Sequence, residues 1–382
     1  MDPLKNIHIY PSNFSNESRI LRTAAAIESL GLFDEIDLVG IMGSESETTV
    51  SQKTKIRRFS RDSSTLSFLP PLKKIVSHVG WLHKVYSHYK NQDLSCINAH
   101  SLTVLPLCAL LKFKTGAKLV YDTHELETKT AGSGKIRQLC SGLIERALIS
   151  YVDYTVVVSS CIKHWYEEKY KLHSIDVIYN CPIPIVLEYS NVLRDELEID
   201  EDNTIFLYQG VLSKGRGVEL LIDAFSNLDA KRYSLVFMGY GPMEDYIISR
   251  SHAIKNVFFR EAVRPEDILR YTSSADVGLS VIEPISLSYE YCMPNKLFEY
   301  LNAGLPVITS PTKEQKLFVE ENRVGLVSED YSPESIKKVV DYLANNKDEY
   351  MESVRKASLT YNWHQESMKI GAIYRKVLGI LK

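Results

Sequence analysis

The sequence predicts an α/β protein with two domains, each a doubly wound parallel sheet. Short apolar runs alternate with amphipathic stretches, and strand-helix-strand repetition of this kind produces a parallel sheet covered by helices on both faces. This alternation of predicted strands and helices is interrupted once, at 180–191, where "NCPIPIVLEYSN" contains two prolines, and it then resumes. With 382 residues, the chain also exceeds the size at which one hydrophobic core usually stops growing.

The first domain is expected over 1–185. Strands are predicted at short apolar runs bounded by polar residues, and helices where apolar residues recur three and four apart. The predicted strands are 6–10, 35–41, 95–100, 118–124, 154–159 and 176–182. The predicted helices are 19–31, 102–113, 135–149 and 161–170.

The second domain is expected over 190–361. Its predicted strands are 204–212, 233–241, 257–263, 276–284, 305–310 and 324–328, and its predicted helices are 217–228, 243–252, 265–275, 294–303 and 333–346. A last helical stretch, 362–382, has no strand after it. We expect this helix to pack back on the first domain.

Composition excludes several classes of protein. The formal net charge of −3 argues against a nucleic-acid partner. The six cysteines form no C-x-x-C pair and have no metal-ligand spacing, which is typical of reduced thiols in a cytoplasmic protein. The start of the chain lacks the pattern of a signal peptide, and no run of 18 apolar residues occurs. A cytoplasmic location is therefore expected.

The stretch "SYEYCMPNKLFEYLNAGLPVITSP", 288–311, predicts an anion site. A short helix should begin near Pro294 or Asn295 and end at a left-handed Gly304. Lys296 in its first turn opposes the helix dipole, unless an anion lies there. The simpler alternative is an ordinary helix-to-strand unit.

Two further elements of the second domain favour a phosphate ligand. "LYQGVLSKGRG" places Lys214 and Arg216 between a strand end and a helix start, a position that suits a phosphate. "FMGYGPM" places Gly239 and Gly241 at another strand end, where a missing side chain permits close approach of a ligand. A solvated loop is the alternative for the first element, and an isolated G-x-G is a weak signal.

In the first domain, polar residues gather at two strand ends. "VYDTHELE" sets Asp122, His124 and Glu125 at one, and "NAHS" sets His100 at the end of the preceding strand. Carboxyl ends of parallel strands are where ligands bind. We interpret these residues as an acceptor-side group, with buried structural histidines as the equal alternative.

Together these motifs resemble the family 4 glycosyltransferases of the GT-B fold. The resemblance covers nearly the whole chain and is most specific in "MPNKLFEYLNAGLPVITS"; it also includes "YDTHE", "YQGVLSKGRGVELLIDAF" and "VFMGYGPM". It implies two Rossmann-like domains facing a central crevice, with retention of the donor's anomeric configuration.

The resemblance also implies roles for single residues. Glu299 matches the glutamate that binds the donor ribose, and the loop from Cys292 to Leu297 matches the one that offers backbone N–H groups to the diphosphate. Arg216 matches the family's cation, and His124 matches the histidine near the transferred sugar. The predicted catalytic residues are thus His124, Arg216 and Lys296. The predicted donor-binding residues are Lys214, Gly239, Gly241, Glu290, Tyr291, Pro294, Asn295, Leu297 and Glu299.

Three departures from the family pattern stand out. Val211 replaces the usual arginine after the first glycine, so Lys296 is expected to supply the missing charge. Tyr291 occupies the first position of the family's E-x7-E pair, with Glu290 one residue out of register. "PSNFSN" replaces the glycine-rich loop after the first strand.

The predicted function is a retaining glycosyltransferase that moves a sugar from a nucleotide-diphosphate sugar to a hydroxyl of a glycan or lipid-linked glycan in polysaccharide or cell-envelope biosynthesis. No cofactor and no metal are expected, because cations can neutralise the diphosphate and no Asp-x-Asp ends a strand. A sugar-nucleotide epimerase and a non-catalytic scaffold or partner subunit are the alternatives.

A basic stretch in the first domain suggests contact with an anionic membrane surface. In "LPPLKKIVSHVGWLHKVYSHYK", helical spacing predicts an inward stripe that includes Val76, Val79 and Leu82, and leaves Lys74, Trp81 and Lys84 facing outward. With the basic segment "KTKIRR" just upstream, this composition is typical of a helix resting on an anionic bilayer. The alternative is a solvated basic face.

Overall fold

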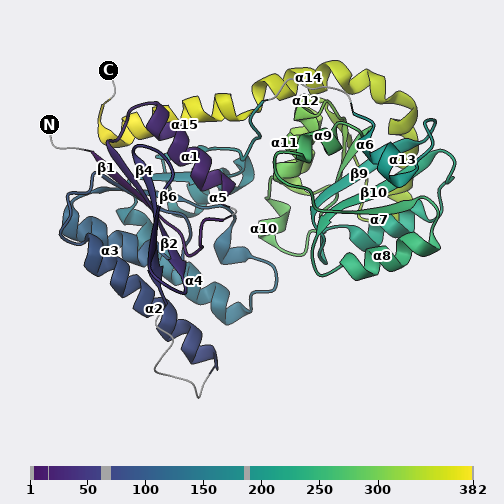
Figure 1. Cartoon of the computed structure of the whole chain (residues 1–382). Helices are drawn as coiled ribbons and strands as arrows, with labels where there is room; N and C mark the ends of the chain where they lie inside the picture. Colours follow the sequence, from purple (N-terminus) through teal and green to yellow (C-terminus); the bar gives the residue numbers. More distant parts are fainter. Residues whose placement is uncertain (1–3, 16, 62–69, 185–189, 381–382) are drawn as a thin grey trace. The chain divides into compact units, whose positions relative to one another are not determined.

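The computed structural model describes residues 4–15, 17–61, 70–184 and 190–380, with side chains from Val76 onward in the helix that begins at Pro70. The chain forms two compact units (Figure 1). The first comprises 1–178 and 367–382, and the second comprises 179–366. The predicted boundaries, 1–185 with 362–382 and 190–361, differ from these by five to eleven residues. Each unit is an α/β sandwich with helices on both faces of its sheet.

The first unit contains an eight-stranded sheet in the order β3-β4-β2-β1-β5-β6-β7-β8. Only β3 is antiparallel to its neighbour; the other pairs are parallel. The strands are β1 (Lys5–Ile9), β2 (Glu35–Met42), β3 (Ser46–Thr49), β4 (Thr54–Ser60), β5 (Cys96–Ala99), β6 (Lys118–Asp122), β7 (Tyr154–Val157) and β8 (Ile175–Val177).

The helices of the first unit are α1 (Ser18–Ser29), α2 (Pro70–Tyr89), α3 (Leu105–Thr115), α4 (Lys135–Leu148) and α5 (Ser160–Tyr170), with 3-10 turns η1 (Glu127–Lys129) and η2 (Ile149–Tyr151). The last helix, α15 (Trp363–Leu378), joins this unit from Ser367 onward. The Tyr374 hydroxyl on α15 donates a 2.7 Å hydrogen bond to Asn98 Oδ1 in β5. This bond fixes the helix on the sheet.

The second unit contains a six-stranded sheet in the order β11-β10-β9-β12-β13-β14, with parallel pairing throughout. Its strands are β9 (Thr204–Val211), β10 (Tyr233–Tyr240), β11 (Val257–Glu261), β12 (Val277–Ser280), β13 (Val307–Thr309) and β14 (Gly325–Val327). Its helices are α6 (Val192–Leu197), α7 (Val218–Phe225), α8 (Glu244–Ala253), α9 (Ile268–Thr272), α10 (Leu287–Glu290), α11 (Asn295–Asn302), α12 (Lys313–Asn322), α13 (Pro333–Asn346) and α14 (Met351–Thr360), with η3 (Lys347–Tyr350).

The prediction of two doubly wound parallel-sheet domains is confirmed. In the second unit the strand order reverses at β9, which lies between β10 and β12. Loops that leave such a switch point diverge to opposite faces and leave room for a ligand outside the strand ends. The loops after β9 and β12 are therefore the expected ligand-binding loops of this unit. A crevice between the two domains stays a prediction.

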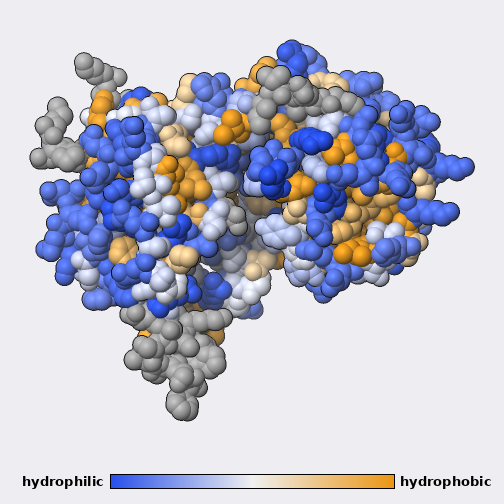
Figure 2. Space-filling model, in the orientation of Figure 1, coloured by the Kyte–Doolittle hydropathy of each residue, from blue (hydrophilic) through white to orange (hydrophobic). Residues whose placement is uncertain are grey.

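Each unit buries its strands and exposes a mostly polar surface. In the second unit, β9 and β10 bury apolar side chains on both faces, since each face of the sheet is covered by helices. Figure 2 shows polar and charged residues over most of the visible surface, with apolar patches among them. Within the described residues, no helix is both long enough and apolar enough to cross a bilayer.

The orientation predicted for α2 is wrong for Val76, Val79 and Trp81. Trp81 is fully buried and its indole N–H donates a 2.9 Å hydrogen bond to the Gly40 carbonyl. Val85 and Tyr89, four and eight residues further on, are buried on the same face, whereas Val76 and Val79 are 39% and 56% exposed. The helix turns its aromatic side chains inward because they carry polar groups that find buried partners.

The basic membrane surface expected around α2 is also absent from the described side chains. Lys84 is half-buried and donates to Ser60 Oγ at 2.7 Å, and the side chain of Lys74 lies outside those that the structure describes. In the upstream segment, now β4, Arg57 pairs with buried Asp37 at 3.1 Å and Lys55 pairs with Glu47 at 3.3 Å. These cations contribute to local ion pairs.

The burial of Trp81 makes a stability prediction. Trp81→Ala should lower the free energy of unfolding by about 3–5 kcal/mol, because it removes a large buried side chain and leaves the Gly40 carbonyl without its donor. Val79→Ala, on the exposed face of the same helix, should change it by less than about 0.5 kcal/mol. Urea denaturation followed by far-UV circular dichroism measures both. Small changes of equal size in the two variants would support the sequence-based prediction that Trp81 faces outward.

Candidate functional site

The loop after β9 is shaped by glycines that permit close contact with the loop after β12. Gly217 has φ +79°, and a Cβ there would lie 2.8 Å from the Val281 carbonyl oxygen. Gly215 has φ +76°, and its carbonyl accepts a 3.0 Å hydrogen bond from the Glu283 N–H. The loops after β9 and β12 are therefore in direct backbone contact. Arg216, between these glycines, is held beside the loop after β12.

Arg216 and Lys296 converge on this point from different elements. The Arg216 guanidinium carbon lies 4.7 Å from the ring centre of Tyr289, and Lys296 Nζ lies 3.3 Å from the ring centre of Tyr208 in β9. Burial lowers the pKa of Lys296 well below its ordinary value, and the charge of Arg216 lowers it further. The two cations therefore repel one another at close range.

Neither cation has a carboxylate partner within ion-pair distance among the side chains that the structure describes. The negative charge of Glu299, one helical turn after Lys296, raises the pKa of Lys296 and so partly offsets this lowering. Its carboxylate, however, accepts a 2.5 Å hydrogen bond from Gln209 Nε2. Two converging cations with no direct counter-charge are the electrostatic setting of an anion site.

The N-terminus of α11 adds to this positive field. The helix begins at Asn295, as predicted, and Pro294 precedes it in extended conformation, with φ −70° and ψ +138°. No side chain caps the helix and its first turn contains no acidic residue. The helix ends at the left-handed Gly304, with φ +77°, also as predicted. The Asn295 side chain is exposed, so it is the first helical residue and not the cap.

Leu297 contributes to the core more than to the predicted anion site. Its side chain is fully buried, and its backbone N–H already donates a 3.1 Å hydrogen bond to the Pro294 carbonyl. The N–H groups of Asn295 and Lys296 remain at the start of the helix.

The glycines of the β10 strand end are explained by backbone packing. A Cβ on Gly239 would lie 1.9 Å from the Gly210 carbonyl oxygen in the neighbouring strand. Gly241 has φ +149°, and a Cβ there would lie 2.4 Å from the Leu212 carbonyl oxygen. Both glycines let the ends of β9 and β10 approach each other, with no ligand needed.

The remaining predicted donor residues lie around the same loops with other contacts. Lys214 is exposed at the tip of the loop after β9. Glu290 accepts a 3.1 Å hydrogen bond from the Lys313 N–H at the start of α12, and the Lys313 ammonium lies 5.6 Å from the ring centre of Tyr291. Glu290 and Tyr291 therefore both contact Lys313.

Sequence reasoning missed three residues that organise this site. Tyr208 and Tyr289 provide the rings beside the two cations. Gln209 contacts Glu299, and its side-chain oxygen accepts a 2.7 Å hydrogen bond from the Thr272 hydroxyl. A polar Gln209 within the apolar run "TIFLYQGVL" was the available signal, since a polar residue in a buried strand usually has a specific partner.

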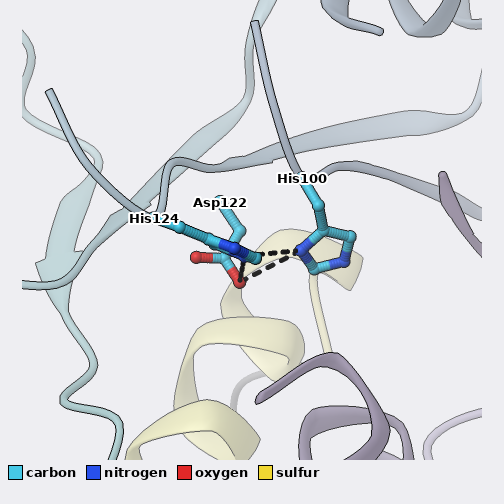
Figure 3. Close-up of side chains that lie close together, drawn as sticks. All are labelled: His100, Asp122 and His124. Atoms are coloured by element: carbon cyan, nitrogen blue, oxygen red, sulfur yellow. Dashed lines mark hydrogen bonds and ion pairs between the residues drawn. The ribbon is translucent and has the colours of Figure 1, made fainter. Parts of the chain in front are cut away.

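A second polar cluster lies at the strand ends of the first unit (Figure 3). His100 follows β5, Asp122 ends β6 and His124 lies two residues beyond. His100 Nδ1 is 3.3 Å from both Asp122 Oδ2 and His124 Nε2, and His124 Nε2 is 3.8 Å from the same carboxylate oxygen. The prediction that these residues lie together is confirmed for these three. Glu125 is exposed in the following loop.

Arg19 fixes the charge of Asp122. The guanidinium of this α1 residue donates to Asp122 at 2.8 Å and 3.3 Å and to the Ile178 carbonyl at 2.7 Å. Burial opposes ionisation, but the Arg19 charge prevails and holds the pKa of Asp122 well below its usual range. Asp122 is therefore an ionised carboxylate in a buried ion pair.

His100 belongs to a buried chain of hydrogen bonds that the sequence did not reveal. Its Nε2 lies 2.8 Å from Nδ1 of His8 in β1, and His8 Nε2 lies 3.3 Å from the amide of Asn6. Burial lowers the pKa of both His8 and His100, so both rings are neutral at pH 7. Both ring nitrogens of His100 thus have partners, which orients the ring toward His124.

The spacing of His100, Asp122 and His124 would also suit a divalent metal, since their donor atoms lie within 4.8 Å of one another. Arg19, however, already neutralises the Asp122 carboxylate, and its Nε shares Oδ2, the oxygen that faces both histidines. A hydrogen-bonded cluster that holds His124 in place accounts for the same contacts.

The depressed pKa of Lys296 predicts proton-linked anion binding. Sulfate, an anion whose own charge stays constant at neutral and alkaline pH, would favour the charged form of Lys296 beside it, so sulfate binding should take up protons and weaken as pH rises. Titration calorimetry in buffers of different ionisation enthalpy measures the uptake. Lys296→Met should abolish it, and Lys214→Met, which removes an exposed cation, should not. Proton release, or an uptake that survives in Lys296→Met, would contradict this account.

Comparisons with known proteins agree with the fold. Residues 190–359 match the family model described as glycosyl transferases group 1, and these residues lie within the second unit. A lipopolysaccharide 1,2-N-acetylglucosaminetransferase of Salmonella typhimurium is 25% identical over 232 residues, which cover 56% of this chain and 60% of that protein. An uncharacterized glycosyltransferase of Methanocaldococcus jannaschii is 23% identical over 288 residues, or 71% of each chain.

Solved structures extend the likeness to both units. A sucrose-phosphate synthase from Thermosynechococcus elongatus has a TM-score of 0.78 at 15% identity and covers 99% of this chain and 100% of its own. The Anabaena protein HepE, solved in complex with UDP and glucose, has a TM-score of 0.73 at 14% identity, with 99% and 100% coverage. The fold is GT-B, and the family match in its second unit supports a glycosyltransferase.

Proposed function

We propose that this protein transfers a sugar from a nucleoside-diphosphate sugar to a hydroxyl acceptor with retention of anomeric configuration. The convergence of Arg216 and Lys296 at the N-terminus of α11 carries this proposal. A diphosphate supplies the negative charge that these cations lack among the described residues. HepE, one of the structural relatives, was solved with UDP and glucose, which supports a donor of this class.

The proposed chemistry uses the two cations at the moment of bond cleavage. Departure of the nucleoside diphosphate places negative charge on its terminal phosphate, and preorganised cations in a partly buried site stabilise that charge. A leaving phosphate oxygen on the same face can accept the proton of the incoming hydroxyl, so the site needs no strong separate base. Retention rests on the family resemblance alone.

Glu299 and His124 have the supporting roles. Gln209 holds the Glu299 carboxylate beside the end of β9, which suits it to accept hydrogen bonds from ribose hydroxyls. In the first unit, the His8–His100 pair orients the half-buried His124, which we assign to the transferred sugar. Asp122 and Arg19 anchor this histidine cluster as an ion pair.

The proposed acceptor is a glycan or lipid-linked glycan of polysaccharide or cell-envelope biosynthesis. The Salmonella relative, 60% of whose length is aligned, is named for transfer to lipopolysaccharide and supports this class. We also propose that the reaction is metal-independent, since Arg216 and Lys296 can neutralise the diphosphate. A non-catalytic GT-B subunit is the second candidate, favoured by Val211 where the family has an arginine.

The direct test is release of nucleoside diphosphate from a panel of sugar nucleotides, with and without EDTA. We expect release from one or a few donors, unchanged by the chelator and abolished in Lys296→Met. Loss of activity in EDTA that returns with added metal would overturn metal independence. Tight donor binding without release, in the presence of glycan and lipid-linked acceptors, would favour the non-catalytic subunit.

Glu299→Ala should weaken donor binding by about one to two decades, because a charge-assisted hydrogen bond contributes roughly 1.5–3 kcal/mol. Glu299→Gln keeps the side-chain shape and should show a smaller part of the loss. Glu320→Ala is the matched control, since this α12 glutamate is 56% exposed and pairs only loosely with Lys316 at 3.9 Å. Calorimetric titration with the donor identified above measures all three. An affinity in Glu299→Ala equal to that of Glu320→Ala would remove the ribose assignment.

A further inference from the structure

Helix α4 presents an apolar face to solvent. Ile136, Leu139 and Leu143 are 80%, 65% and 60% exposed, and their spacing of three and four residues places them on one face of the helix. Ile144 at the edge of this face is 43% exposed. Isolated exposed apolar residues are common, but an ordered row over several turns marks an interaction surface.

The opposite side of α4 fixes the helix to the first unit. Glu145, which projects away from Leu143, is fully buried, and its carboxylate accepts hydrogen bonds of 2.5 Å from the Tyr166 hydroxyl and 2.8 Å from the Tyr170 hydroxyl. A 14-residue helix held by its polar side leaves its apolar side outward. The amphipathic pattern of α4 is thus inverted relative to an ordinary surface helix.

Basic side chains border the apolar face on both edges. Lys135 and Arg146 lie along one edge and Arg137 along the other, and all three are exposed. The helix contains one acidic residue, Glu145, which is buried on the opposite side. Helix α3, which packs against α4, adds the exposed apolar residues Leu110 and Phe113 nearby, at 52% and 80%.

We propose that α4 docks the first unit onto an anionic lipid bilayer. The helix would lie in the plane of the interface, with its apolar row in the acyl boundary and its basic residues among the headgroups, which is the pattern of an interfacial amphipathic helix. This surface takes the place of the one expected on α2. It goes beyond the proposed transfer reaction, and it would bring a lipid-linked acceptor to the enzyme.

The charge distribution favours a bilayer over a second copy of this chain. Two α4 faces packed against each other would bring the basic edges of one copy to those of the other, with no exposed acidic side chain on either helix to pair with them. An anionic bilayer satisfies both the apolar row and its basic edges. Self-association is therefore an outcome of the test that would contradict the proposal.

Cys140 provides a probe at the centre of the face. It is the one fully exposed cysteine, four of the others are buried, and burial raises the pKa of the Cys292 thiol to about 12. A maleimide carrying an environment-sensitive fluorophore should therefore react selectively with Cys140 at pH 7. With vesicles of phosphatidylcholine and phosphatidylglycerol, we expect a blue shift that reverses as salt is added.

A matched probe controls for general adsorption. The fluorophore at Lys338→Cys in a Cys140→Ser background, on α13 of the second unit, should show no shift; the Lys338 side chain is 74% exposed. Sedimentation of unlabelled protein with the same vesicles gives an independent measurement. The double variant Lys135→Gln/Arg137→Gln should bind these vesicles about 25-fold more weakly, because each basic residue contributes about five-fold to the affinity. Lys316→Gln/Lys338→Gln should bind as the unaltered protein does.

Three results would overturn the proposal: no shift at Cys140 with anionic vesicles, an equal shift with pure phosphatidylcholine, or a shift that appears without vesicles as protein concentration rises. Affinity for nucleoside diphosphate, measured in the same α4 variants, should not change. A loss of vesicle binding with intact nucleotide affinity separates this surface from the donor site, so either proposal can fail alone.

Discussion

The second unit depends on one electrostatic constraint, the close approach of Arg216 and Lys296 without a carboxylate between them in the described structure. Burial and mutual repulsion make the charged form of Lys296 costly, as the direction of its pKa shows. The N-terminus of α11 adds positive potential at the same place. An anion would relieve all three costs at once, which supports the proposed diphosphate site.

The fold creates that constraint through strand order and glycine. Because the sheet reverses at β9, the loops after β9 and β12 start at the same edge and diverge. Gly215 and Gly217 let these loops touch, and Gly239 lets the ends of β9 and β10 approach. The backbone therefore sets the position of Arg216. In the first unit, the carboxyl edge of the sheet instead carries the neutral His8–His100 pair, next to the ion pair of Asp122 and Arg19.

Much of this architecture could be predicted from local patterns. The spacing of apolar residues and the turn residues between them located every strand of the two sheets except β3 and β4. The start of α11 and the glycine after it follow from short-range chemistry. Orientation around a helix axis was harder. Trp81 was placed outward because it falls outside the apolar stripe that includes Val76 and Val79, whereas its hydrogen-bond partner, Gly40, lies 41 residues away in the sequence. Such long-range polar contacts leave no periodic signal in the sequence.

The candidate site was predictable to a similar degree. Residue types pointed to Arg216, Lys296 and the His100–Asp122–His124 cluster, because each stands at a strand end or helix start. The partners Arg19, His8 and Gln209 were missed, since only tertiary contacts reveal their roles. Glu290 was assigned one residue out of register with the family pair, and its carboxylate accepts a hydrogen bond from the Lys313 N–H.

The most direct test of the central claim is an experimental structure with a nucleoside diphosphate bound. The account predicts that the diphosphate lies between the Arg216 guanidinium and the Lys296 ammonium, next to the backbone N–H groups of Asn295 and Lys296, with the ribose at Glu299. A nucleotide bound elsewhere in the second unit, or bound here with Lys296 still over the Tyr208 ring and out of reach of phosphate, would contradict it.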